Sequence, residues 1–257
     1  MIRTDTLLII SAFLMLASAA VIAAQGTNEA LFISLNSDLA TLLPDAFWSN
    51  MTFVADTLFA VAVIAILASR QPHLFNTGLV LLITGAAFVH GFKFLLEVPR
   101  PPAVLDAEMV RIIGPVLKNH SFPSGHSFTA LATAGLIMLH TRSLFCAVLV
   151  LVIGLIAALS RAAVGAHWPL DILTGGAAGL LFAQFAKALC ARYWWLQGEG
   201  LQRFSAVLMT ITCVALIFHV SRYPDTRILS ASTGVIATLF LCGYWWRQLG
   251  RLRNRAN

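Results

Sequence analysis

The sequence predicts an all-α protein, a polytopic bundle of transmembrane helices, and three observations support this prediction. Of the 257 residues, 59% are hydrophobic and only 11% are charged, whereas a soluble domain carries roughly a quarter charged residues. The mean hydropathy is +0.83. The apolar residues gather into runs that approach the length needed to cross a bilayer. We therefore expect one integral membrane domain that accounts for residues 1–257.

Eight apolar segments are expected to form the helices of this bundle. Several are shorter than the roughly 20 residues that a perpendicular span requires, and the fourth and seventh are the weakest. The segments run near 6–24, 48–68, 77–96, 127–141, 144–161, 169–188, 205–220 and 229–246.

The first segment follows Arg3 and has an alternative interpretation as a cleaved signal peptide, with Ser18-Ala19-Ala20 as small residues near a cleavage site. The second segment contains Asp56, and an acid inside a span is a functional candidate that could line a substrate cavity or pair with a neighbouring helix.

Prolines and glycines mark the ends and contacts of the later segments. Three prolines at 99, 101 and 102 end the third segment. Pro169 is compatible with the first turn of the sixth segment. Gly175 and Gly179 form a GxxxG motif there, which predicts close helix packing near the polar clusters described below rather than a dimer interface.

Two long loops also carry helical apolar spacing. Leucines recur every three to four residues between Leu31 and Leu43, and apolar residues do the same between Met109 and Leu117. Such stretches can lie in the headgroup plane. Whether they cap the bundle or form a rim that admits a lipid sideways stays open.

The distribution of basic residues predicts the orientation. With a cytoplasmic N-terminus, the positive-inside rule is satisfied, because most basic residues then lie on the cytoplasmic side and acidic residues gather on the other. The basic residues are Arg3, Arg70, Arg142, Lys187, Arg192, Arg203, Arg247, Arg251, Arg253 and Arg255. Since they lie at segment ends, the net charge of +6 does not indicate a nucleic-acid partner.

Three short polar clusters interrupt the apolar chain, at Lys93–Arg100, Pro123–His126 and Ser160–Asp171. Together they supply three cations, two histidines, a hydroxyl and a carboxylate, which are the groups needed to hold a phosphate and attack it. The predicted topology places all three clusters on the non-cytoplasmic side. Charged groups near a bilayer are costly, so we do not expect them to gather there by accident.

The first cluster offers two cations. Lys93 and Arg100 are seven residues apart, about two helical turns, so we expect both side chains to face one direction. Taken alone, both are explained equally well as cations that reach from a helix end to the membrane surface.

The second cluster has the composition of a helix start. Ser124 and Gly125 can direct a hydroxyl and backbone N–H groups toward an anion, and the helix dipole adds partial positive charge. An ordinary N-cap and turn would also account for this segment if it stood alone.

The third cluster combines Arg161, His167 and Asp171. His167 and Asp171 are four residues apart and share a face if the helix begins at or before His167. A carboxylate bonded to one ring nitrogen fixes the tautomer and leaves the other nitrogen nucleophilic. Arg161 can grip two phosphate oxygens at once.

As a set, the clusters carry a specific resemblance. They read KxxxxxxRP, PSGH and SRxxxxxHxxxD, complete and in order, and they closely resemble the motifs of the type 2 phosphatidic acid phosphatase family, the membrane relatives of acid phosphatases and vanadium haloperoxidases. The motif positions are Lys93, Arg100, Pro101, Pro123, Ser124, Gly125, His126, Ser160, Arg161, His167 and Asp171.

The resemblance implies a role for each position. His167 would attack phosphorus and form a phosphohistidine, Asp171 would orient it, and His126 would protonate the leaving oxygen and then activate water. The nonbridging oxygens would be held by Lys93, Arg100, Ser124, Gly125 and Arg161. No metal or other cofactor is expected, since the cations supply what Mg²⁺ supplies elsewhere.

The resemblance also implies a six-helix core, about 48–190 here, so that the last two segments, about 205–246, would be an addition. The expected activity is hydrolysis of a terminal lipid phosphate or diphosphate, with undecaprenyl diphosphate, phosphatidylglycerol phosphate, phosphatidic acid and lipid A as candidates. The expected location is a bacterial inner membrane with the site facing the periplasm. The expected partners are the lipid substrate and the bilayer, with no obligate protein partner evident.

Two rival functions stay open. A phosphotransferase would use the same His167 intermediate with a lipid acceptor in place of water. A non-catalytic transporter or scaffold could retain the fold alone, although every motif residue is present. Two further histidines near the clusters have weaker expectations. His90 could contact a site residue or make a structural hydrogen bond, and His120 could touch a headgroup.

Overall fold

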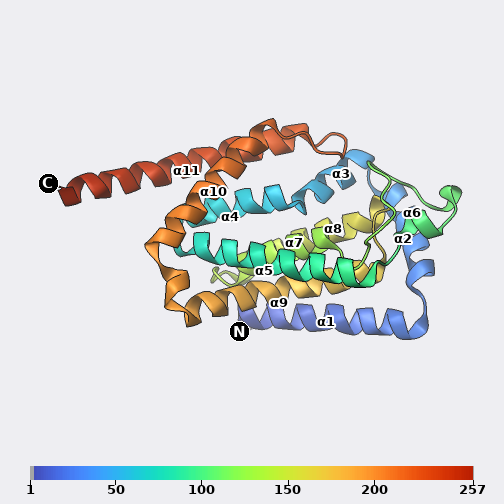
Figure 1. Cartoon of the computed structure of the whole chain (residues 1–257). Coiled ribbons are helices and arrows are strands. Elements are labelled where there is room, and N and C mark those ends of the chain that lie inside the picture. Colours follow the sequence, from blue (N-terminus) through green and yellow to red (C-terminus); the bar gives the residue numbers. More distant parts are fainter. Residues whose placement is uncertain (1–2, 257) are drawn as a thin grey trace.

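The chain folds into an elongated bundle of helices (Figure 1). The computed structural model describes residues 3–256, and the side chains of residues 3–251. Within these residues the regular structure is entirely helical, which confirms the predicted all-α class.

Seven of the eight apolar segments correspond to one helix each, and the second is divided between α3 and α4. The helices are α1 (Thr4–Gln25), α2 (Asn28–Leu42), α3 (Asp45–Val54), α4 (Thr57–Arg70), α5 (His73–Leu96), α6 (Pro101–Val104), α7 (Gly125–Met138), α8 (Leu144–Ala163), α9 (Pro169–Arg192), α10 (Glu199–Phe218) and α11 (Arg227–Ala256), with 3₁₀ turns at Ala107–Met109 and Trp194–Gln197.

Six helices are long and apolar enough to cross a membrane: α1, α5, α8, α9, α10 and α11. The pair α3 and α4, bent by 58°, adds a seventh span if it is counted as one. The fourth apolar segment, one of the two weakest, forms α7, which has 14 residues and is about 21 Å long at 1.5 Å per residue. It is not among the candidate spans. It lies in the middle of the bundle against α8 and α9.

Asp56 explains the bend in the second segment. It is not inside a continuous helix, as the sequence suggested, but is the N-cap of α4, where its Oδ1 accepts a hydrogen bond from Leu58 N at 2.7 Å. A side-chain cap of this kind satisfies one of the free N–H groups at a helix start. The break therefore costs little backbone hydrogen bonding.

The GxxxG motif brings α9 onto α7, as predicted. A Cβ atom at Gly175 would lie 2.4 Å from Ser124 O, and one at Gly179 would lie 2.3 Å from Phe128 O. Any larger residue at either position would push the two helices apart. The contact is sealed by a hydrogen bond of 3.0 Å from Ser124 N to Asp171 O, so the second and third polar clusters meet at the starts of α7 and α9.

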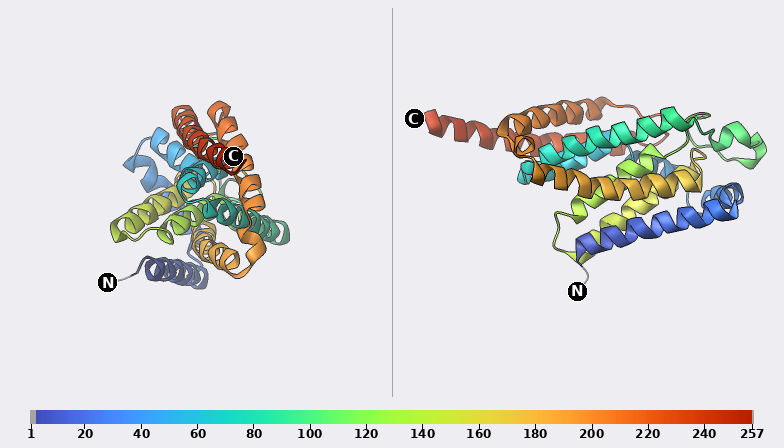
Figure 2. Two further views of the ribbon diagram at one scale, coloured as in Figure 1. Left: turned by 90° about the vertical axis from the view of Figure 1, so that its left-hand side faces the viewer. Right: turned by 60° about the horizontal axis from the view of Figure 1, so that its bottom comes forward.

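The two ends of the bundle differ in charge. At one end, Thr4 donates a hydrogen bond to Thr141 O and Lys187 donates one to Leu139 O. Arg70 and Arg192 are the last residues of α4 and α9 there. The polar clusters lie at the other end, together with the connection from α5 to α7 (Figure 2).

The two outer loops had different outcomes. The first forms α2, a helix that Asn36 ties to the rest of the protein through hydrogen bonds to Arg111 O and Ala162 O. The second is helical only in the 3₁₀ turn at Ala107–Met109, and the prediction of a helix up to Leu117 is wrong. Val110 and Ile113 are buried instead, so the apolar spacing reflects packing of an irregular segment.

The last two helices are an integral part of the bundle. α10 packs against α4, α5 and α11, and α11 packs against α4. Their buried residues, among them Met209, Leu216 and Tyr244, belong to the same apolar cluster as residues of α4, α5, α7 and α9. α1, in contrast, lies on the outside along α9 (Figures 1 and 2).

Candidate functional site

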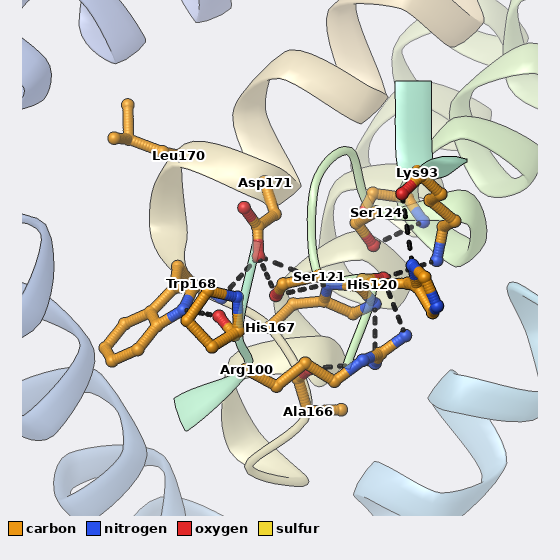
Figure 3. A network of polar contacts seen from close by, with 12 residues as sticks. Lys93, Arg100, His120, Ser121, Ser124, Ala166, His167, Trp168, Leu170 and Asp171 are labelled. Atoms are coloured by element: carbon orange, nitrogen blue, oxygen red, sulfur yellow. Dashed lines mark hydrogen bonds and ion pairs between the residues drawn. The ribbon is translucent and has the colours of Figure 1, made fainter. Parts of the chain in front are cut away.

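The structure brings all three polar clusters together at one end of the bundle (Figure 3). His167 lies in the turn between α8 and α9, and its side chain is only 1% exposed. Its Nδ1 is 3.3 Å from Asp171 Oδ2. Asp171 is in the first turn of α9, which begins at Pro169, so the predicted pairing over four residues is present.

The turn that carries His167 is fixed by backbone hydrogen bonds. Arg161 O accepts from Ala166 N at 3.0 Å and from His167 N at 3.2 Å. Gly165 has φ +73°, a conformation that L side chains rarely adopt, and a Cβ atom there would lie 2.5 Å from Arg111 O. This turn ends α8 and directs His167 back over the start of α9.

Asp171 is held by two further donors. Trp168 N donates to Oδ2 at 3.0 Å, and the Ser121 hydroxyl donates to the same oxygen. The Trp168 indole is itself anchored by a hydrogen bond of 2.8 Å from Nε1 to Pro99 O. The carboxylate that faces His167 therefore has a fixed orientation.

The other ring nitrogen of His167 identifies its tautomer. Nε2 is 3.1 Å from Nη1 of Arg100, and because a guanidinium can only donate, Nε2 must be the acceptor. The proton is then on Nδ1, where it faces Asp171. Burial first, and then the charges of Arg100, Arg161 and Lys93, hold the pKa of His167 well below its ordinary value. The imidazole is accordingly neutral, and the electron pair on Nε2 accepts the hydrogen bond from Arg100.

Arg100 is fixed by main-chain carbonyls. Its Nε donates to Asn119 O at 2.7 Å, Nη1 to Ala166 O at 3.0 Å and Nη2 to His120 O at 3.3 Å. The expectation that Arg100 shares a helix face with Lys93 is wrong, because α5 ends at Leu96 and Arg100 is in an extended conformation. The two cations nevertheless converge through the fold of the connection that follows.

Lys93 reaches the same carbonyl from the last turn of α5. Its Nζ donates to His120 O at 2.9 Å, while His120 Nδ1 is 3.0 Å from Lys93 O. His120 has φ +55°. Its peptide group therefore bridges the two cations of the first cluster, and its side chain caps the end of α5.

The second cluster forms the start of α7. Ser124 is fully buried and is the N-cap, with its Oγ accepting hydrogen bonds from Ser127 N at 3.3 Å and Ser127 Oγ at 2.8 Å. Gly125 is the first residue of the helix, where an N–H group has no carbonyl partner within the helix. His126 Nε2 lies 4.0 Å from Asp56 Oδ2.

Arg161 lies in the last turn of α8. It is 1% exposed, its Nη1 donates to the Tyr223 hydroxyl at 2.9 Å, and its guanidinium carbon lies 5.3 Å from the centre of the Tyr223 ring. Its Nε is buried and has no hydrogen-bond partner among the described residues. This unused donor is available to a ligand.

A cavity of about 450 Å³ connects these groups with the apolar interior. At its polar end it is lined by Lys93, Arg100, His126, Arg161 and His167. The rest is lined mainly by apolar residues of α4, α5, α7 and α10. His90 also lines the cavity, whereas Asp56 does not contribute to its lining and faces His126 instead.

Sequence reasoning missed three residues of this site. Ser121 and Trp168 hold Asp171, and Tyr223 holds Arg161. Ser121 and Trp168 are close in sequence to the second and third clusters, and this proximity was the one available signal. Tyr223 is 62 residues from Arg161, and no local pattern connects them.

The charges at the polar end are unequal. Lys93, Arg100 and Arg161 provide three cations, against the two carboxylates of Asp171 and Asp56, which lie beside His167 and His126. An excess of buried positive charge favours a ligand with more than one negative charge, and a phosphate group satisfies this condition. In the part of the chain that the structure describes, no group of three His, Cys, Asp or Glu side chains is arranged to hold a metal ion.

A family model described as the PAP2 superfamily matches residues 73–199 of this chain. No curated protein matches it. Two solved structures are similar. The crystal structure of Aquifex aeolicus LpxE has a TM-score of 0.55 and 21% sequence identity, covering 63% of this chain and 94% of that protein. The crystal structure of the transmembrane PAP2-type phosphatidylglycerolphosphate phosphatase from Bacillus subtilis has a TM-score of 0.44 and 24% sequence identity. This similarity covers 72% of this chain and 96% of that protein.

Proposed function

The chain belongs to the PAP2 superfamily and is a membrane lipid phosphate phosphatase of that type, and from this premise we propose that it removes a terminal lipid phosphate through a phosphohistidine at His167. One observation supports this proposal most directly. A single cavity joins a neutral, buried His167 and three cations to an apolar lining contributed by four helices.

The first step uses the electron pair on His167 Nε2. This nitrogen attacks phosphorus, a P–N bond forms and the P–O bond to the lipid breaks. His126 gives its proton to the leaving oxygen, so that a lipid alcohol leaves from a monoester and a lipid monophosphate leaves from a diphosphate. The Nδ1 proton stays on the ring and faces Asp171, which stabilises the positive charge that develops on the imidazole.

The second step returns the enzyme to its starting state. His126 takes a proton from water as the water oxygen attacks phosphorus, and the P–N bond breaks to release phosphate. For this role His126 must titrate between two states. Burial first, and then the charges of Arg161, Arg100 and Lys93, hold the pKa of His126 well below its ordinary value. The Asp56 carboxylate, 4.0 Å from Nε2, acts in the opposite direction and favours the protonated form. Asp56 is therefore proposed to support His126.

The nonbridging phosphate oxygens are held by five groups. Lys93, Arg100 and Arg161 provide charge, and Arg100 and Arg161 are fixed before the ligand arrives. Because the Ser124 hydroxyl oxygen accepts from Ser127, its own hydrogen is free to donate to phosphate. The Gly125 N–H is free at the start of α7. The contact between Arg100 and Nε2 is exchanged for a contact with phosphate when the substrate binds.

The substrate class follows from the lining of the cavity. A charged end and an apolar remainder fit a phosphate attached to a hydrocarbon chain. Undecaprenyl diphosphate, phosphatidylglycerol phosphate, phosphatidic acid and lipid A phosphates all meet this description, and the site is proposed to act on a member of this class.

The proposed location is a bacterial inner membrane with the site facing the periplasm. Its support is the distribution of charge, since Arg70, Lys187 and Arg192 lie at the end of the bundle opposite His167. Basic residues favour the cytoplasmic side of a membrane.

A phosphate-release panel tests the proposed function. The purified protein is compared on prenyl diphosphates, glycerophospholipid phosphates and lipid A in one detergent and buffer, with free phosphate and phosphorylated lipid acceptors both measured. We expect free phosphate from at least one lipid class. Phosphate transfer to a lipid without free phosphate would favour the phosphotransferase, and no product of either kind would contradict the proposal.

A further inference from the structure

The C-terminal helices α10 and α11 reach the phosphate end of the cavity through their connecting loop. Tyr223, in this loop, is buried and accepts a hydrogen bond of 2.9 Å from Nη1 of Arg161. The same guanidinium lies against the tyrosine ring. Nothing in the PAP2 motifs accounts for this contact, because the matched region ends at residue 199.

The loop that carries Tyr223 is held in place on several sides. Thr226 Oγ1 donates to Tyr223 O at 3.0 Å, and Asn50 of α3 donates to Asp225 O at 3.2 Å. The ring packs closely on the backbone at Gly114, where a Cβ atom would lie 2.7 Å from Tyr223 Cδ1. The hydroxyl is thus presented to Arg161 from a rigid support.

The geometry points to Tyr223 as a positioning residue for Arg161 in the proposed reaction. An arginine has many rotamers, and ordering it when substrate binds costs entropy. With Nη1 bonded to the Tyr223 hydroxyl and the guanidinium carbon 5.3 Å from the ring centre, Nε is left without a partner among the described residues and the side chain lines the cavity. The expected change in turnover rests on the proposed function, whereas the measurement of phosphate binding tests the inference independently.

The test uses Tyr223→Phe in the full chain, which removes the hydroxyl and keeps the ring. We expect kcat/KM to fall by about tenfold, the loss typical of one hydrogen bond to a charged group. The dissociation constant of inorganic phosphate, measured by calorimetry, should rise in parallel. Tyr193→Phe is the matched control, since Tyr193 is 43% exposed at the opposite end of the bundle, and it should leave both values unchanged.

A double variant separates positioning from general stability. Arg161→Met has no side-chain donor for Tyr223, so adding Tyr223→Phe to it should cause no further loss of phosphate affinity. The inference would be overturned if Tyr223→Phe lowered phosphate affinity equally in the presence and absence of Arg161. It would also be overturned if Tyr223→Phe alone left phosphate affinity unchanged. If the wild type binds phosphate but releases none from any lipid, the proposed function fails while this inference is still decided by binding.

A second inference comes from the wall of the cavity. Ser205, Leu208, Met209 and Thr212 of α10 line it, with the spacing of one helix face. Met209 lies close to α5, because a Cβ atom at Gly78 would lie 3.0 Å from Met209 Cε. We infer that Met209 limits how far a hydrocarbon chain extends between α5 and α10, and so contributes to selection by chain length.

The test compares short-chain and long-chain substrates of the same headgroup. Met209→Trp should lower kcat/KM for the long chain by about tenfold or more relative to the short chain, because the added volume fills the cavity. Ile211→Trp is the matched control, since Ile211 on the same helix is 61% exposed on the outer surface and does not line the cavity. Met209→Ala enlarges the same space and should shift the preference toward longer chains. An unchanged ratio in Met209→Ala, or equal losses for both chains in a folded Met209→Trp, would overturn this inference.

Discussion

Two regions of the molecule contribute to the same cavity in different ways. The first is the site formed by α5 and α7–α9, and the second is the C-terminal pair, α10 and α11. In the first region, polar side chains are fixed by main-chain groups, as in Arg100, whose three nitrogens donate to three carbonyls. The second region contributes the buried Tyr223 hydroxyl and the face of α10 that includes Leu208 and Met209. We infer that the chemistry resides in the first region, while the second adjusts one cation and selects the hydrocarbon chain.

The largest expected effect lies in the first region. Asp171→Asn would present an amide donor where His167 Nδ1 now donates, so the ring would change tautomer and Nε2 would carry the proton. We expect kcat to fall by about 10³-fold or more, by analogy with the same exchange in Ser-His-Asp triads. The measurement is phosphate release at saturating substrate.

Its control is the thermal unfolding temperature, which should stay close to that of the wild type because Asn keeps the shape of Asp. Full activity in a folded Asp171→Asn variant would show that Asp171 does not set the tautomer of His167.

A smaller effect is expected for Arg100→Lys. Lysine keeps the charge but cannot donate to Asn119 O, Ala166 O and His120 O together from one planar group. We expect kcat/KM to fall by about 10²-fold. Arg111→Lys is the matched control, because Arg111 is an exposed arginine that pairs with the carboxylate of Asp45. If the two variants lost equal activity, Arg100 would have no special role.

Ser121→Ala should have a moderate effect. It removes one of the donors to Asp171 but leaves the hydrogen bond from Trp168 N. We expect about a tenfold loss in kcat with little change in KM. Ser121→Thr retains the hydroxyl and should restore most of the rate where space allows. A loss confined to KM would place Ser121 in substrate binding instead.

No effect is expected from removal of divalent metal ions. The proposed transition-state charge is stabilised by Lys93, Arg100 and Arg161, which do not depend on a metal. Phosphate release should therefore persist in EDTA at the untreated rate. A strict requirement for Mg²⁺ would contradict a site built from cations of the protein alone.

The sequence predicted well those features that depend on local pattern. The apolar runs identified every long helix, and the spacing of His167 and Asp171 predicted their contact over one turn of α9. GxxxG predicted the close packing of α9 on α7. In each case the residues that make up the pattern lie close together along the chain or share one helix face.

Features that depend on distant contacts were not predictable in the same way. The convergence of Lys93 and Arg100 does not come from helix periodicity, because α5 ends at Leu96, the predicted end of the third segment, and Arg100 is in an extended conformation. The path that follows is set by carbonyls at 118–120 and by Trp168. Tyr223 reaches Arg161 only because α10 and α11 pack against α4 and α5, and periodicity contains no information about that packing.

The most direct test of the central claim is to trap the covalent intermediate. The wild type is mixed with a lipid phosphate that it hydrolyses, quenched in alkali, where a phosphohistidine survives, and digested for mass spectrometry. The account predicts a phosphoryl group on the peptide that contains His167, and its absence from His167→Ala, which should release no phosphate although it folds. Undiminished phosphate release by His167→Ala, or a phosphoryl group on another residue, would contradict it.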